Sequence, residues 1–392
     1  MKRLRHVLIS LIITVLLFVP GMVVTAPLAA AKETATESSP ATVLTGAFHW
    51  LYANAWASDT EPRVIPGGQS IGIKLHASGI LVVGYHLTHQ GKDAVSPAEQ
   101  ARVRVGDVIV AIDGQKVANV GQVAQLIEQA GVQKRSMQLS IRRKGNAVLT
   151  RIKPIYDADS GSYRLGMFIR DSASGVGTLT FYVPETHQFG ALGHVIADAD
   201  TGQPIEGDGQ IVHATVTSID RGESGQPGEK RGSFLNDHMI LGHIARNTEY
   251  GVFGTMDSAP DHGLYDQPIS VARAQDVHVG TAQMLTVVSD QKVQAFTVQI
   301  VKVNHQTSAD IKGMVIRVTD PVLLAKTGGI VQGMSGSPLL QDGKLIGAVT
   351  HVFVSDPTQG YGIYAQWMVK ATEGSGKGKG ALQGRSQHKQ VV

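Results

Sequence analysis

The sequence predicts a chain of mixed class in three parts: an N-terminal signal or membrane segment, an α+β domain, and a mainly-β domain. Residues 7–31 form a long uncharged run. Residues 64–155 alternate strand-like and helix-like patterns, and residues 156–372 are short strand-like segments between Gly, Pro, Asp and Asn turns. At roughly 100–200 residues per domain, a chain of 392 residues is long enough for two or more domains.

The composition excludes several classes of function. Lys and Arg number 35 against 32 Asp and Glu, a net charge of +3, which argues against a nucleic-acid binder working through bulk charge. The absence of cysteine excludes disulfides, thiolate metal sites and a cysteine nucleophile. The sequence has no His-Glu-x-x-His motif and no histidine spacing typical of a metal site. We therefore expect neither a cofactor nor a metal.

The N-terminus has the features of a targeting segment. Lys2, Arg3 and Arg5 precede the uncharged run, and residues 29–31 (Ala-Ala-Ala) offer a cleavage site, an order typical of a secretory signal. The run of 25 residues is also long enough to span a bilayer if it is not cleaved, so residues 1–31 are a signal peptide or a membrane anchor. Either alternative predicts an extracytoplasmic chain. Residues 32–63 are predicted to be a linker, and residues 373–392 a disordered tail.

Residues 64–155 predict a compact α+β domain. Two strands are predicted within residues 70–85, separated by Gly79. Ser96 followed by proline predicts the start of a helix. Residues 108–112 predict a strand, residues 120–128 a helix with one apolar face, and residues 137–149 a hairpin.

This domain resembles a bacterial PDZ domain in residues 97–98 (Pro-Ala), 106–109 (Gly-Asp-Val-Ile) and 112–114 (Ile-Asp-Gly). In PDZ domains a loop of the form x-Φ-Gly-Φ binds the terminal carboxylate of a peptide, which adds a strand to the sheet edge. The resemblance implies that the peptide-binding loop is formed by Ser70, Ile71, Gly72 and Ile73. The alternative is that Gly72 only relieves crowding within a strand.

Residues 333–338 (Gly-Met-Ser-Gly-Ser-Pro) are the strongest chemical signal in the chain. Acyl transfer by serine needs a hydroxyl on a tight turn and backbone N–H groups directed at the developing oxyanion. The hexapeptide resembles the G-x-S-G-G-P run of trypsin-like proteases, with Ser335 as the nucleophile and Ser337 in place of the second glycine. A predicted hairpin over residues 338–350 follows it, as in that fold.

The base and the acid are less clear from the residues alone. His194 follows a small-residue turn between apolar segments and precedes Ser335 by about 140 residues, and imidazole titrates in the range that suits a base near neutral pH. Other histidines remain open as the base: His213, His238 and His243. Asp320 lies fifteen residues before Ser335, whereas other carboxylates have more conventional positions: Asp198, Asp220, Asp237 and Asp257.

The order of an N-terminal membrane segment, one PDZ domain and a serine-peptidase domain resembles the SpoIVB peptidase family, and residues 64–72, 189–196 and 319–338 are similar to it. The resemblance implies a mainly-β, trypsin-like serine-peptidase domain at residues 156–372. It further implies that Ser335 is the nucleophile, His194 the general base and Asp320 the acid that orients it. The backbone N–H groups of Gly333 and Ser335 would form the oxyanion hole.

The resemblance also implies a biological role. Members of this family are signalling proteases of endospore-forming bacteria, exported into the space between the forespore and mother-cell membranes, either anchored or secreted. They cleave a membrane-bound regulator and themselves, which triggers processing of a late sigma factor precursor, and their PDZ domain contacts the target and other copies. Two rival interpretations remain: a general extracytoplasmic quality-control protease with a PDZ domain, and a non-catalytic PDZ adaptor. No nucleic-acid partner is expected.

Overall fold

The computed structural model describes residues 61–90, 93–233 and 239–372. The predicted signal or anchor segment, most of the predicted linker and the tail lie outside these residues. Within them, no helix is both long and apolar enough to cross a membrane. Strands dominate the described chain, so the prediction of a mainly-β protein with one α+β domain is confirmed.

Six antiparallel strands close into a first barrel, because β2 pairs with β13 on one side and with β11 on the other. In order around the ring they are β2 (Ser70–Tyr85), β13 (Gly207–His213), β16 (Ile240–Thr248), β17 (Gly251–Met256), β12 (Gln188–Ala191) and β11 (Met167–Val183). Alternating residues such as Ile71, Ile73 and Leu75 are buried in its core, as expected for strands with one face turned inward. The short strands β1 (Arg63–Pro66) and β18 (Ile269–Ser270) continue the sheet beside β11.

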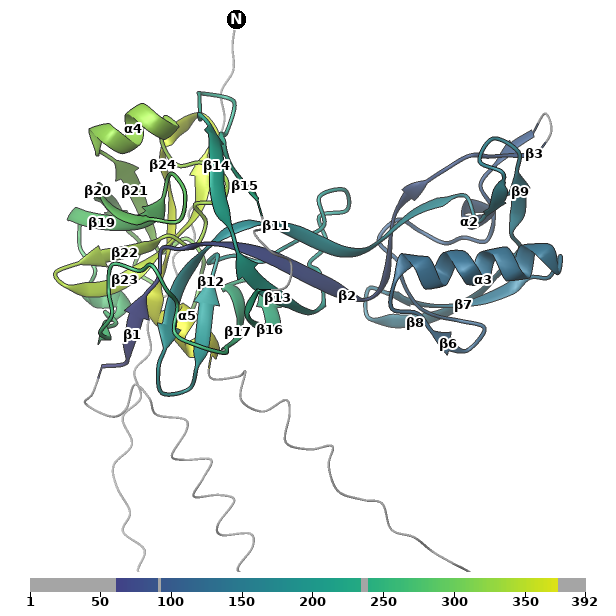
Figure 1. Ribbon diagram of the computed structural model, residues 1–392, viewed down its shortest axis with the longest axis horizontal. Helices are drawn as coiled ribbons and strands as arrows, with labels where there is room; N and C mark the ends of the chain where they lie inside the picture. The colour runs from purple at the N-terminus through teal and green to yellow at the C-terminus, as the bar shows by residue number, and fades with distance from the viewer. Residues whose placement is uncertain (1–60, 91–92, 234–238, 373–392) are drawn as a thin grey trace, which may run out of the picture. The chain divides into compact units, whose positions relative to one another are not determined.

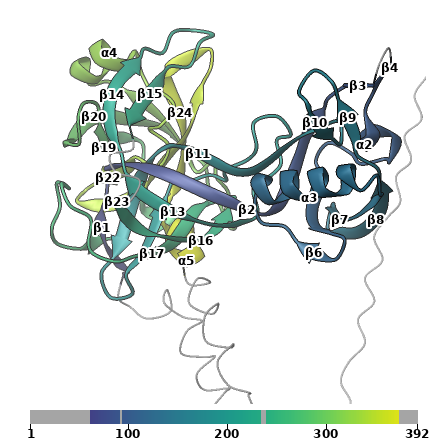
Figure 2. The ribbon, with the colours of Figure 1, turned by 45° about the vertical axis from the view of Figure 1, so that its right-hand side comes forward.

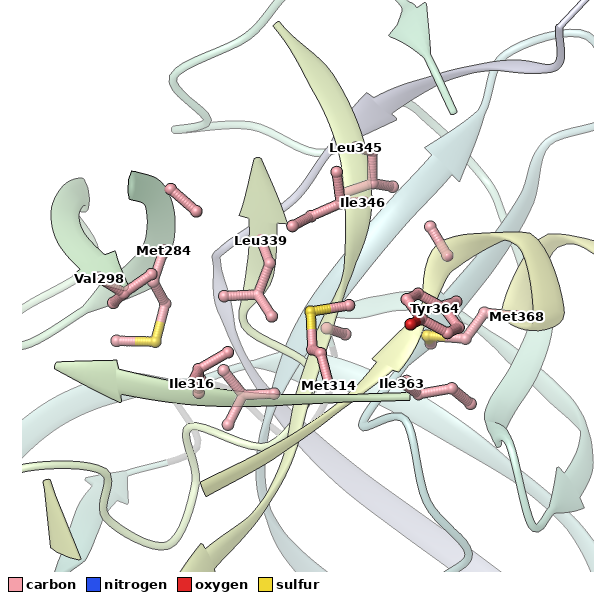
Figure 3. Close-up of a cluster of buried hydrophobic side chains, with 14 of the residues drawn as sticks. Met284, Val298, Met314, Ile316, Leu339, Leu345, Ile346, Ile363, Tyr364 and Met368 are labelled. Atoms are coloured by element: carbon pink, nitrogen blue, oxygen red, sulfur yellow. The ribbon is translucent and has the colours of Figure 1, made fainter. Parts of the chain in front are cut away.

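Six further strands form a second closed barrel. They are β19 (Gly280–Val287), β20 (Val293–Val303), β21 (Met314–Val318), β24 (Asp356–Tyr364), β23 (Lys344–Phe353) and β22 (Pro338–Gln341). Figure 3 shows side chains from several of these strands meeting in one apolar cluster, among them Met314, Leu339 and Tyr364. The helix α5 (Ala365–Thr372) directly follows β24 and adds Met368 to this cluster.

An α+β domain is inserted between β2 and β11, and its core consists of buried residues between Ile80 and Leu165. Its principal elements are α2 (Pro97–Gln100), β5 (Val108–Ile112), β6 (Gln115–Lys116), α3 (Val120–Val132), β7 (Met137–Arg143) and β8 (Asn146–Ile152). Two small hairpins complete it: β3 (Thr88–Gln90) with β4 (Asp93–Val95), and β9 (Ile155–Asp157) with β10 (Ser162–Arg164). Ser96 accepts a hydrogen bond from the N–H of Glu99, which confirms it as the N-cap of α2. Figure 2 shows α3 beside β7, and Val123 and Ile127 of α3 are buried in this core.

The inserted domain and the first barrel share two long strands. β2 and β11 pair with each other from the barrel to the inserted domain, from Ser70 opposite Thr178 to Tyr85 opposite Met167 (Figure 1). Residues 70–85 form one strand, so the predicted separation into two strands is wrong. The pairing of this strand with β11 is nevertheless interrupted at residues 77–80, where Gly79 has a φ of +131°. The inserted domain therefore interrupts the sequence of the first barrel. Residues 64–75, at the start of the predicted PDZ domain, contribute buried side chains to the cores of the barrels instead.

The remaining elements lie around the second barrel and the segment before β22. They are the hairpin β14 (Thr215–Asp220) with β15 (Glu229–Ser233), the short helix η1 (Ala274–Asp276) and the helix α4 (Pro321–Thr327). Asp320 is the N-cap of α4, and Gly328 ends the helix with a φ of +73°. Gly228 and Lys230 hydrogen-bond to the backbone of Gln332, so the β14–β15 hairpin supports the segment that leads to Ser335.

Candidate active site

The turn that carries Ser335 is fixed by its glycines and by β11. Gly333 and Gly336 have φ of +89° and +90°, values that glycine adopts readily and other residues rarely. A Cβ atom on Gly336 would lie 2.2 Å from the carbonyl oxygen of Thr178. Thr178 donates twice to the turn, from its hydroxyl to the carbonyl of Gly333 (2.8 Å) and from its N–H to the carbonyl of Ser335 (3.0 Å). The turn is therefore held directly against β11.

The two serines of the hexapeptide lie in different environments. Ser335 is half-buried and lines an open cavity of about 670 Å³, with its Oγ 2.9 Å from the carbonyl oxygen of Thr350. Ser337 is fully buried and does not line this cavity, and its Oγ has no hydrogen-bond partner in the described part of the chain. Only Ser335 can meet a substrate.

His194 lines the same cavity as Ser335. It follows β12 through Leu192 and Gly193, which both have positive φ (+69° and +72°), so the chain turns sharply before the imidazole. Nδ1 lies 2.8 Å from the carbonyl oxygen of Val195. Because a carbonyl can only accept, Nδ1 carries the proton and Nε2 keeps its lone pair. Burial lowers the pKa of His194 below its ordinary value of 6.5, which favours the neutral base.

A second histidine adjoins His194 and was not recognised from the sequence. The ring centroid of His351 lies 5.1 Å from that of His194, with the rings tilted by 41°. The pKa of His351 is lowered by burial first, and then by the charges of His194 and Lys312. The only signal for it in the sequence is its position at the end of the predicted hairpin that follows the nucleophile.

The backbone around Ser335 provides unused donors. Within the described residues, neither the N–H of Gly333 nor that of Ser335 donates a hydrogen bond, whereas the neighbouring N–H groups of Gln332, Gly336 and Ser337 all do. Such a pair of free N–H groups can stabilise an oxyanion formed at the serine. The predicted oxyanion hole at Gly333 and Ser335 therefore has the donors that it needs.

The structure does not bring Asp320 to His194. The carboxylate of Asp320 accepts hydrogen bonds from the N–H groups of Val322 and Leu323 (2.9 and 3.1 Å) and of Thr297 (3.3 Å). Asp320 does not line the cavity of Ser335. In this geometry it acts as a helix cap, and the imidazole is oriented by a carbonyl group.

Among the residues that the structure describes, Asp198 is the one carboxylate that lines the cavity. It is buried (2 % exposed) and forms an ion pair with Arg170, while the N–H groups of Asp200 and Thr201 donate to it. The pKa of Asp198 is lowered by its hydrogen bonds to Thr201 and Arg170, against the opposing and largest effect of burial. Both carboxylate oxygens of Asp198 are therefore occupied by contacts that hold the loop after His194 in place.

The other candidates lie elsewhere. His213 and His243 are on β13 and β16 and do not line the cavity, and neither do Asp220 and Asp257. His238 and Asp237 lie outside the described residues.

A buried lysine lies directly behind the nucleophile turn. Lys230 on β15 is 1 % exposed, and its Nζ donates to the hydroxyl of Thr286 (2.7 Å). A Cβ atom on Gly333 would lie 3.1 Å from the Cβ of Lys230, so the lysine side chain packs against the turn. No carboxylate pairs with it among the described residues, and burial lowers its pKa from 10.5 to about 7. In the sequence Lys230 stands between Glu229 and Arg231, and this charged context does not indicate a buried side chain.

The prediction that residues 70–73 form the peptide-binding loop is wrong. Residues 70–73 form the barrel end of β2, where β11 pairs with one edge and β13 with the other. All four residues are buried. Because both edges are occupied by strands of the same chain, no peptide can add there.

A different groove on the inserted domain has the required form. It has a volume of about 800 Å³ and lies between α3 and the start of β11. Leu165, Gly166 and Met167 line it and repeat the Φ-Gly-Φ pattern, and Gly166 has a φ of +70°. Within the described residues, the N–H groups of Leu165 and Gly166 donate to no other group, and Arg164 lines the groove beside them. This loop can receive a carboxylate.

One group of possible metal ligands also lies on the inserted domain. His89, Asp157 and Asp159 each place one ligand atom within 4.8 Å of the others. Asp157 already accepts hydrogen bonds from Ser160 and from the N–H of His89, and Asp159 pairs with the His89 ring. These contacts account for the three side chains without a metal ion.

Two family models match this chain. Residues 161–369 match the family model of the SpoIVB peptidase S55, and residues 93–140 match that of a PDZ domain. No curated protein matches. One similar solved structure is the PDZ domain of the SdrC-like protein from Listeria monocytogenes, with 20% identity and a TM-score of 0.20, covering 24% of this chain and 87% of that one. Another is the active form of the Rv3671c protease from M. tuberculosis, with 18% identity and a TM-score of 0.30, covering 53% of this chain and 78% of that one.

The match to the SpoIVB peptidase S55 family covers more than half of the chain. The chain belongs to the SpoIVB peptidase S55 family of serine peptidases and carries a PDZ domain.

Proposed function

We propose that this protein is an exported signalling endopeptidase that cleaves a membrane-bound regulatory protein and copies of itself, and thereby triggers processing of a late sporulation sigma factor precursor. Family membership supports this role. We further place the protein in the space between the forespore and mother-cell membranes, held there by its N-terminal segment or secreted. The PDZ domain would recognise the target through the groove between α3 and β11.

The observation that carries the proposal is the shared cavity of Ser335 and His194. Nε2 of His194 accepts the proton of the Ser335 hydroxyl as Oγ attacks the carbonyl carbon of the scissile peptide bond. The N–H groups of Gly333 and Ser335 stabilise the oxyanion. His194 then donates its proton to the leaving amine, and water hydrolyses the resulting ester by the reverse route.

Two features of the cavity fit this sequence of steps. The carbonyl of Val195 holds Nδ1 and so keeps Nε2 available as the base. The Ser335 hydroxyl donates to the carbonyl of Thr350, so Oγ must rotate from that carbonyl toward His194 to transfer its proton. Catalytic hydrogen bonds commonly tighten only in the complex with substrate.

Fluorophosphonate labelling of the full-length protein tests the assignment. We expect labelling to be lost in Ser335→Ala and strongly reduced in His194→Ala, and retained in Ser337→Ala, because Ser337 is buried away from the cavity. Labelling that survives in Ser335→Ala would contradict the proposal. No labelling of the wild-type protein would favour a non-catalytic PDZ adaptor.

A further inference from the structure

The strand β11 has one edge that faces the catalytic cavity, and the hydrogen bonds of Thr178 identify it. Thr178 lies opposite Ser70 of β2, yet its N–H donates to the carbonyl of Ser335, so its backbone polar groups point away from β2. The register between residues 172 and 178 of β11 and the facing part of β2 is regular. Because backbone groups alternate between the two edges of a strand, those of Val176 and Ser174 point to the same edge as those of Thr178.

No other strand covers this edge over most of its length. Within the described residues, β11 pairs with β12 and β1 only from Leu179 onward, and between Met167 and Thr178 its only partner is β2. Ser174 and Gly175 are exposed. The open edge therefore begins beside the nucleophile and runs along β11 toward the PDZ domain.

The same strand also forms one wall of the PDZ groove. Residues 165–169 line the groove, and Arg170 together with residues 172–176 lines the cavity of Ser335. β2 pairs with β11 on both sides of an interruption at Asp171, so the groove and the cavity both lie along β11, whose other edge no described strand covers between Met167 and Thr178. The pairing is irregular at two points: at Phe168/Ile169 one residue of β2 is unpaired, and at Arg170/Ser172 residues 77–80 of β2 and Asp171 of β11 are unpaired.

The end of the open edge that lies in the PDZ groove is suited to bind the C-terminus of a polypeptide. The free N–H groups of Leu165 and Gly166 and the guanidinium of Arg164 suit a carboxylate, although Glu128 also lines the groove. Val120, Ala124 and Ile127 of α3 supply an apolar wall for a terminal side chain. The occupant with this chemistry is the C-terminal segment of a polypeptide that ends in an aliphatic residue.

We propose that the peptidase measures its cleavage site from the C-terminus of the substrate, which binds as an added antiparallel strand along β11 from the PDZ groove to Ser335. This inference rests on the proposed peptidase function. A terminal residue opposite Met167 places the residue about nine positions upstream opposite Val176, a span of about 30 Å at roughly 3.4 Å per residue. The scissile bond would then lie about ten residues from the C-terminus.

The chemistry of the cleavage follows from this placement. Ser335 Oγ bonds to the carbonyl carbon, the C–N bond breaks, and the amine of the C-terminal fragment leaves with the proton from His194. Water then releases the N-terminal fragment from its ester. The C-terminal fragment of about ten residues keeps all its contacts with β11, so we expect it to act as a competitive product inhibitor.

Two matched peptide libraries test the proposal on the full-length protein. Both contain degenerate peptides of about 24 residues, a length of about 80 Å when extended at ~3.4 Å per residue, and both end in valine, one as the free acid and the other as the amide. We expect cleavage of the acid library to release mainly C-terminal fragments of about 8–12 residues. The amide library should be cleaved more slowly and without a preferred fragment length.

A uniform distribution of fragment lengths from the acid library would overturn the proposal and leave the peptidase function intact. Cleavage of neither library by a protein that fluorophosphonate labels at Ser335 would also overturn it. Failure of the labelling itself would contradict the proposed peptidase function instead, so the two failures are distinguishable.

A pair of variants tests the edge directly. Ser174→Pro removes the backbone N–H of residue 174 from the open edge and leaves the hydrogen bonds between β11 and β2 in place. A strand tolerates proline at such a position. Ser174→Ala keeps that N–H. We expect kcat/KM for the free-acid library to be at least about tenfold lower in Ser174→Pro than in Ser174→Ala, which corresponds to about 1.4 kcal/mol. Equal kcat/KM values in the two variants, both labelled at Ser335, would refute strand addition at β11.

Discussion

The buried lysine behind the nucleophile turn allows a quantitative prediction. Lys230 is 1 % exposed, and its pKa is lowered from 10.5 to about 7 by burial. At about 1.36 kcal/mol per pH unit, this difference corresponds to a penalty of about 5 kcal/mol on the folded protein when the lysine is charged. Because the side chain is fully buried, solvent screening does not reduce this value.

The pH dependence follows from the lower pKa in the folded state. Between pH 7 and about 10.5 the unfolded chain holds a proton on this lysine and the folded chain does not, so the free energy of unfolding rises with pH. Below pH 7 the penalty is present in full. Lys230→Met removes the penalty but leaves the hydroxyl of Thr286 without its donor, a cost of about 1–2 kcal/mol. The variant should therefore be more stable than the wild type by about 3 kcal/mol near pH 7.

Urea denaturation followed by circular dichroism, near pH 7 and near pH 10, measures this difference. We expect the wild type to gain about 3 kcal/mol between the two pH values and Lys230→Met to gain much less. The exposed Lys302 on β20 provides the control, and Lys302→Met should change the free energy of unfolding by less than about 0.5 kcal/mol. A wild-type pH dependence that persists in Lys230→Met would refute the reasoning.

Three further predictions concern the site. Because burial lowers the pKa of His194 below 6.5, His194 stays neutral as the pH falls, and the acid limb of the kcat/KM profile should lie below about pH 6.5; a limb at or above that value would contradict the assignment. Asp320→Asn keeps a helix cap, so activity should remain within about tenfold of wild type; a loss of about a thousandfold or more would show that Asp320 is the catalytic acid. Arg170→Met leaves the carboxylate of Asp198 buried without its partner, which should destabilise the protein by about 2–4 kcal/mol in urea denaturation; an unchanged free energy of unfolding would show that this ion pair contributes little.

The parts of the site that could be predicted from sequence were those with local signals. The turn at Ser335 needs glycines at positive φ, and the glycines are visible in the sequence. His194 follows a Leu-Gly pair that bends the chain in the same way. His351 and Lys230 gave no local signal, because their roles depend on neighbours that are distant in sequence, His194 and Thr286.

The misassigned peptide loop shows why topology could not be predicted from the same signals. Ile71-Gly72-Ile73 and Leu165-Gly166-Met167 share one pattern of residues; the first lies inside the predicted PDZ domain of residues 64–155, and the second follows its end by ten residues. Their difference lies in pairing: Gly72 is enclosed between β11 and β13, whereas Gly166 precedes the open edge of β11. Which strands flank a glycine is set by contacts between distant segments, and a single sequence does not reveal them.

The insertion of the PDZ domain between β2 and β11 also has a consequence for folding. The barrel end of β2 must find its partner on β11 about one hundred residues later in the chain, a slow step for a flexible segment of that length. A folded PDZ domain holds Tyr85 opposite Met167, which turns this distant search into the zipping of a hairpin. The domain that binds peptides would thus also act as the nucleus from which the first catalytic barrel assembles. Core substitutions in it would then slow the maturation of the peptidase without touching a single catalytic residue.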